Sequence, residues 1–229
     1  MPRQPRLPLT GYPFHCIARG NDRQAVFYND DDFSFYLSCL HDGARKHEVA
    51  VHAYVLMTNH VHLLATPQQP FGLSRLFQSI GRMYVRYINR TYRRSGTLWE
   101  GRFKASLVDA DTYLLACYRY IELNPLRAGM IERAEEYRWS SAKGNLALKE
   151  DRHLIPHEGY VALGRSLEER AQSYRAFLES GIPVSELRDI RKAAGEGRVL
   201  GNDRFREQIE VMLNRRLAPQ KRGPKGRAE

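Results

Sequence analysis

In the first third of the chain, apolar residues recur at the period of strands in some segments and at the period of helices in others. The pattern predicts a strand over residues 12–19, a helix over about 30–46, and two more strands over 49–57 and 60–65. Thr58-Asn59, between the last two strands, is typical of a tight turn. These two strands should therefore form a β-hairpin.

Residues 71–94 follow the period of a long helix with two different faces. One face is apolar and should pack on the core, whereas the other is basic, and the segment contains no acidic residue. Surface helices usually mix charges through pairs four residues apart, so a face of arginines alone favours contact with phosphates over simple solvation. The arginines of this helix and its ends are Arg75, Arg82, Arg86, Arg90, Arg93 and Arg94.

The next segment predicts a loop and short strand over 99–108 and a helix from Asp109 or Asp111 to about Leu123. Proline disfavours helical geometry in the residue before it, so Asn124, before Pro125, should lie at the frayed end of this helix. The resulting order is strand, helix, strand, strand, helix, strand, helix. It predicts a ferredoxin-like α+β fold, an antiparallel sheet with its helices on one face.

The rest of the chain has helical patterning, after a loop and short helix that reach to about residue 150. Helices are expected between Ser166 and Gly181, over 184–194 and over 203–217. We therefore expect three parts, namely an α+β domain over 1–150, a helical C-terminal region over 151–217, and a disordered basic tail over 218–229.

Charge and composition narrow the class of partner. The chain has 36 Lys and Arg against 26 Asp and Glu, which gives a net charge of +10. This charge favours a polyanionic binding partner, and among such partners it favours nucleic acid over a membrane surface. Hydrophobic residues make up 42% of the chain, but no run approaches the roughly 18 apolar residues of a membrane-spanning helix. The N-terminus lacks the apolar segment of a secretory signal peptide. Cys16, Cys39 and Cys117 have no disulfide or zinc spacing, so we expect a cytoplasmic protein.

The candidate chemistry lies in two short segments. His60 and His62 are two apart on a predicted strand, so both imidazoles can reach one metal ion, and Tyr120 and Asn124 are four apart on a predicted helix. Imidazole and amide oxygen suit Mg²⁺ or Mn²⁺ when water and phosphate oxygen complete the coordination. Tyr118 shares its face with apolar residues and should be core. Tyr120 shares its face with small residues and Asn124, which leaves room for a DNA backbone, so Tyr120 is the candidate for attack on a phosphodiester.

Several motifs resemble one family. His60-Val61-His62 resembles the HUH motif of single-tyrosine DNA nucleases. Tyr120-Ile121-Glu122-Leu123-Asn124-Pro125, followed by Leu126-Arg127-Ala128-Gly129, resembles the tyrosine-to-Asn-Pro signature of REP-associated tyrosine transposases, bacterial relatives of small insertion-sequence transposases. The resemblance covers about residues 10–145 and extends to Gly20-Asn21-Asp22-Arg23, Met57-Thr58-Asn59-His60 and Trp99-Glu100-Gly101-Arg102-Phe103.

This resemblance implies a divalent metal, and cleavage and joining of single-stranded or hairpin DNA at repetitive extragenic palindromes, with a 5′-phosphotyrosine and a free 3′-OH as products. It implies metal ligands at His60, His62 and Asn124 and the nucleophile at Tyr120, with Asn124 where many insertion-sequence relatives have Gln. A monomer or homodimer associated with a bacterial nucleoid is expected. The expected DNA contacts are Arg75, Arg82, Arg86, Arg90, Arg93, Arg102 and Lys104.

Two other functions remain as alternatives. A non-catalytic nucleic-acid-binding regulator could keep the same fold and basic surface, although the intact histidine pair and Tyr120 argue against it. A two-histidine phosphoesterase acting on RNA ends would need two His-x-Thr/Ser elements, and the sequence contains none.

Overall fold

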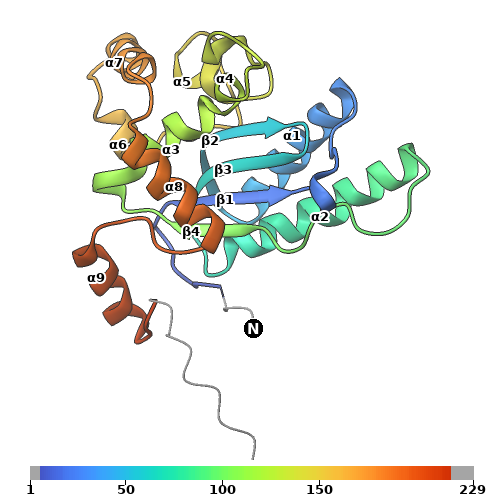
Figure 1. Ribbon diagram of the computed structural model, residues 1–229, viewed down its shortest axis with the longest axis horizontal. Helices are drawn as coiled ribbons and strands as arrows, with labels where there is room; N and C mark the ends of the chain where they lie inside the picture. Colours follow the sequence, from blue (N-terminus) through green and yellow to red (C-terminus); the bar gives the residue numbers. More distant parts are fainter. Residues whose placement is uncertain (1–5, 218–229) are drawn as a thin grey trace, which may run out of the picture.

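A four-stranded antiparallel sheet organises the fold (Figure 1). The computed structural model describes residues 6–217, and its strands lie in the order β2-β3-β1-β4. The hairpin of β2 (Val49–Met57) and β3 (His60–Pro67) turns at Thr58-Asn59, as the sequence predicts. β1 (Phe14–Arg19) pairs with β3 on one side and with the short β4 (Lys104–Leu107) on the other.

One face of the sheet is covered by α1 (Asp30–Lys46) and α2 (Gly72–Thr91). Alternate strand residues such as Val61 and Leu63 point to this side and join its hydrophobic core. The two helices approach closely because α1 carries Gly43 at the contact, where a Cβ would lie 2.8 Å from Leu76 Cδ1. The buried side of α2, which includes Leu76 and Ile80, packs on this core, so the arginine-rich face of the helix points away from the sheet.

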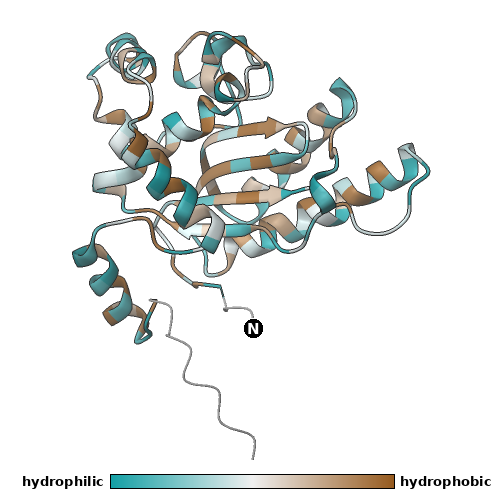
Figure 2. Ribbon diagram, in the orientation of Figure 1, coloured by the Kyte–Doolittle hydropathy of each residue, from teal (hydrophilic) through white to brown (hydrophobic). Residues whose placement is uncertain are grey.

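The opposite face is covered by α3 (Ala110–Glu122) and by helices of the C-terminal region. The α+β class and the antiparallel sheet are confirmed. The expectation of helices on one face holds for α1 and α2, while α3 packs on the other side (Figure 1). The physical reason lies in the hairpin, where residues on both faces, such as Val61 and Leu64, are buried. Figure 2 shows hydrophobic stretches along both strands of the hairpin. A strand that is apolar on both faces needs cover on both.

The C-terminal region joins this second core. Tyr174 of α7 (Leu167–Glu179) and Ile190 of α8 (Val184–Glu196) are buried in it, and α8 contacts β4 and β1. The predicted boundary near residue 150 stays a prediction, and the predicted tail over 218–229 lies outside the described residues. The remaining elements are η1 (Asn21–Arg23), α4 (Asn124–Arg127), η2 (Ala134–Glu136), α5 (Ala142–Asn145), α6 (Glu158–Val161) and α9 (Asp203–Leu213).

None of the helices within residues 6–217 is both long and apolar enough to cross a lipid bilayer.

Candidate active site

The two predicted metal-ligand histidines lie at the start of β3, on the face that α3 covers. β3 begins directly after the turn, so His60 and His62 point to the same side of the sheet, opposite Val61. Their ring centroids are 5.0 Å apart. The period-two spacing of the strand therefore places both imidazoles at one point.

Helix α3 brings the predicted nucleophile to the same point. The ring of Tyr120 lies 5.6 Å, centroid to centroid, from the ring of His62, and its side chain is 7% exposed. Asn124 lies close enough to His60 for its side chain to raise the pKa of that ring, against the larger lowering by burial. Contrary to the expected frayed end, Asn124 opens the one-turn helix α4, because Pro125 fits the first turn of a new helix. All four residues line one cleft of about 830 Å³.

Burial sets the protonation of the histidines. It lowers the pKa of His60 to about 4, with a further lowering from the charge of Arg19, and it lowers the pKa of His62 well below its ordinary value. Both rings are therefore neutral near pH 7, the form in which imidazole binds a metal.

The donor set fits a hard divalent cation only if Asn124 takes part. Within the part of the chain that the structure describes, no three His, Cys, Asp or Glu residues form a group that could hold a metal ion. His60, His62 and the amide oxygen of Asn124 supply two nitrogens and one oxygen, which leaves coordination positions for water and phosphate. His60 and Asn124 line the same cleft, where the side chain of Asn124 affects the pKa of His60.

A third histidine supports the pair, and sequence reasoning assigned it no role. His15 Nε2 lies 2.9 Å from His62 Nδ1, His15 is 1% exposed, and its own Nδ1 has no partner among the described residues. His15 sits diagonally across from His62 because β1 pairs Ile17 with His62. A hydrogen bond to Nδ1 leaves Nε2 of His62 as the nitrogen for a metal. Only the register of β1 against β3 reveals this contact.

Arginines surround the tyrosine. The Arg127 guanidinium carbon lies 4.3 Å from the centroid of the Tyr120 ring, and Arg127 also donates to the Tyr120 carbonyl oxygen at 3.0 Å. Arg19 and Arg191 line the same cleft. Arg127 belongs to a motif that the sequence analysis identified without giving the residue a role, whereas no local pattern points to Arg191.

The predicted DNA-contact residues fall into separate places. Arg102 and Lys104 line the cleft of Tyr120, Arg75 lines a second cavity of about 420 Å³ beside α2, and Arg102 lines both. The other predicted contacts are exposed, on or just after α2 and across the sheet from Tyr120: Arg82, Arg86, Arg90 and Arg93. The structure therefore offers a basic cleft, which reaches the start of α2, and a row of exposed arginines further along that helix.

Comparisons with known proteins identify a family and a similar fold. A family model described as "Transposase IS200 like" matches residues 9–124, and no curated protein matches the chain significantly. A solved structure described as a REP-associated tyrosine transposase bound to a REP hairpin matches with a TM-score of 0.56 and 16% identity, covering 68% of this chain and 89% of that chain. A Deinococcus radiodurans protein described as a candidate transposase has a TM-score of 0.38 and 18% identity, covering 56% of this chain and 97% of that chain.

The matched segment contains the whole sheet and reaches from β1 through both histidines and Tyr120 to Asn124. It is also half of the chain. This protein therefore belongs to the IS200-like transposase family.

Proposed function

We propose that this protein cleaves and rejoins single-stranded or hairpin DNA through a covalent 5′-phosphotyrosine at Tyr120. A divalent metal, Mg²⁺ or Mn²⁺, would be held by His60, His62 and Asn124. The observation that carries the proposal is the convergence of these four side chains in one basic cleft. The transposase family supports the kind of reaction, since its members act on DNA.

The bond changes balance without an external energy source. The Tyr120 hydroxyl oxygen attacks the phosphorus and loses its proton to solvent, and the bond from phosphorus to the 3′ oxygen breaks. The departing oxygen takes up a proton and becomes a free 3′-OH. One phosphate ester replaces another, so a 3′-OH can later attack the phosphotyrosine and restore a DNA strand. A bound divalent ion would polarise the scissile phosphate and offset its growing negative charge.

The residues of the chain prepare this step. Arg127 stacks on the Tyr120 ring, which limits its rotation and places a positive charge beside the phenol. Tyr120 is 7% exposed and lines the cleft, so the surrounding residues hold its ring in place at the cleft wall. The hydrogen bond between His15 Nε2 and His62 Nδ1 holds the ring of His62 and orients it toward the cleft.

For the substrate we propose a palindromic hairpin with an adjoining single strand, of the REP type. The structural relative was solved with a REP hairpin, and this chain shares its fold. The net charge of +10 and the exposed arginines of α2 supply a surface for a DNA backbone.

The test is incubation with candidate palindromic single strands and Mn²⁺ or Mg²⁺, followed by a denaturing gel. Wild-type protein should form a protein–DNA adduct, and Tyr120→Phe should form none while hairpin binding survives. Tyr113→Phe is the matched control, because Tyr113 lies on the same helix and does not line the cleft. Cleavage by Tyr120→Phe at the wild-type rate contradicts the mechanism. Hairpin binding by wild-type protein without metal-dependent cleavage favours a non-catalytic regulator instead.

A further inference from the structure

We infer that Arg191, on helix α8 of the C-terminal region, binds a backbone phosphate of the DNA strand that enters the cleft of Tyr120. This inference rests on the proposed function and adds a substrate-binding residue to it. Arg191 lies outside residues 9–124, the segment that the family model matches. The C-terminal region would then be part of the active site.

Several contacts fix α8 against the sheet. Ser106 of β4 donates to the carbonyl oxygen of Ala193 at 2.8 Å, and Lys104 Nζ donates to that of Gly195 at 2.9 Å. At the other end of α8, Glu186 pairs at 2.7 Å with Arg119 of α3, whose side chain is only 4% exposed. Because α3 also carries Tyr120, this ion pair ties the helix of the nucleophile to α8. The position of Arg191 relative to Tyr120 is therefore set by these three contacts, of which the bond from Ser106 to Ala193 is buried.

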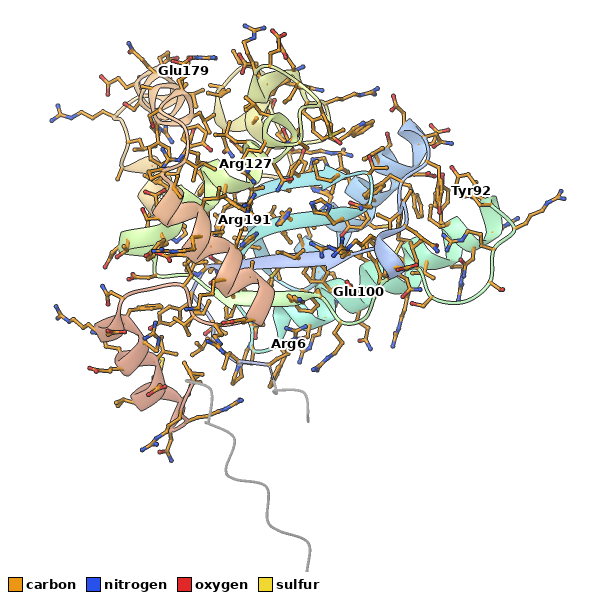
Figure 3. The ribbon with its side chains drawn as sticks, in the orientation of Figure 1. Arg6, Tyr92, Glu100, Arg127, Glu179 and Arg191 are labelled. Carbon is orange, nitrogen blue, oxygen red and sulfur yellow. The ribbon has the colours of Figure 1, made fainter. Side chains whose placement is uncertain are left out.

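The periodicity of α8 turns Arg191 toward the cleft. Ile190, Ala193 and Ala194 form its buried side. At about 100° per residue, Arg191 lies at the edge of this side, whereas Lys192 points directly away from the sheet. Arg191 accordingly lines the cleft together with Arg127, and Lys192 does not. Figure 3 labels both arginines, Arg191 on α8 and Arg127 at the end of α4. The charge of Arg191 also contributes to the lowered pKa of Arg127, after the larger effect of burial.

The cleft holds an excess of unpaired positive charge. Its lining includes six cationic side chains and two carboxylates, and one of these carboxylates, Glu196, pairs with Arg198 at 2.8 Å. Within the part of the chain that the structure describes, Arg19, Arg127 and Arg191 form no ion pair.

Like charges in a shared cleft repel each other, and an anion between them relieves this repulsion. Guanidinium groups bind phosphate oxygens through charge-assisted hydrogen bonds. Since the cleft also contains the nucleophile, the anion that fits is the DNA phosphate backbone near the scissile bond.

The experiment compares Arg191→Ala with Lys192→Ala, because both remove one positive charge from α8. Binding of a fluorescent single strand that spans the cleavage site is measured by anisotropy in EDTA, over a series of salt concentrations. Arg191→Ala should weaken binding about tenfold and reduce the slope of log K against log[salt] by about 0.7, the value for one phosphate of a single strand. Lys192→Ala should leave both unchanged, and Arg191→Lys should restore the slope.

Wild-type affinity and salt slope in Arg191→Ala would overturn the inference, and so would an equal loss in Lys192→Ala. Circular dichroism of each variant verifies folding. Failure of the proposed function is read separately: wild-type protein would bind the strand but form no adduct with Mn²⁺, while the comparison of the two α8 variants still tests Arg191.

Discussion

A buried carboxyl two residues after Tyr120 makes the stability of this protein depend on pH. Glu122 is fully buried on α3, where its carboxyl accepts hydrogen bonds from Ser141 and Asn145 on one oxygen and from Tyr174 on the other. Burial raises the pKa of Glu122 to about 7, and the three donors oppose this rise without cancelling it. Glu122→Gln removes the charge and keeps the shape, since its amide oxygen can accept from Ser141 and Asn145 while its nitrogen donates to Tyr174.

The size and sign of the effect follow from linkage. The folded-state pKa of about 7 lies above the ordinary value of 4.5, so the folded protein holds the proton more tightly than the unfolded chain does. This contribution to stability is fully present below pH 4.5 and is lost as the pH rises through 7. At about 1.4 kcal/mol per pKa unit, the loss is roughly 3 kcal/mol. For a chain of this length, that corresponds to a change in Tm of roughly 6–12 °C.

The assay is urea and thermal unfolding of wild type and Glu122→Gln at pH 5 and pH 8. The variant should be more stable than wild type at pH 8, by up to roughly 3 kcal/mol, and the difference should shrink toward pH 5. Glu179→Gln, at the exposed end of α7, removes the same charge and serves as the control. A variant less stable than wild type at pH 8 would refute the reasoning, because the ionised carboxylate would then be stabilised by its three donors.

Two further predictions concern the site and the outer helix. His15→Phe removes the hydrogen-bond partner of His62 and should weaken Mn²⁺ binding by the DNA-free protein at least about tenfold in calorimetric titration. His15→Gln should retain most of the affinity, because its amide oxygen can replace the lost partner. Equal affinity in His15→Phe and wild type would contradict this prediction. Combined alanine substitution of Arg82, Arg86 and Arg90 should lower the slope of log K against log[salt] for hairpin binding by roughly 2–3. The rate of single-turnover cleavage at saturating protein should stay unchanged. An unchanged slope would exclude α2 from the DNA contact.

The parts of the site that depend on short spacings could be predicted from the sequence. The hairpin and the shared face of His60 and His62 follow from the periods of single elements. The spacing of four residues also predicts that Tyr120 and Asn124 lie together, and both line the cleft although Asn124 begins α4. Each period acts within a few residues, so no tertiary information is needed.

The parts that depend on how elements meet could not be predicted. The contact of His15 with His62 follows from the register of β1 against β3, and the position of Arg191 follows from the docking of α8 on β4. Similarly, the sequence marks a basic face on α2 but does not say that α2 and α3 lie on opposite sides of the sheet. Long-range packing decides all three.

The most direct test of the central claim is to locate the covalent bond. The protein is incubated with a palindromic single strand and Mn²⁺, digested with nuclease and trypsin, and examined by mass spectrometry. Cleavage after Arg119 and Arg127 releases residues 120–127, in which Tyr120 is the only hydroxyl-bearing side chain. The account predicts a nucleotide phosphate on this peptide, absent without the metal and absent in Tyr120→Phe. Strand cleavage with the adduct on another peptide, or with no adduct at all, would contradict it.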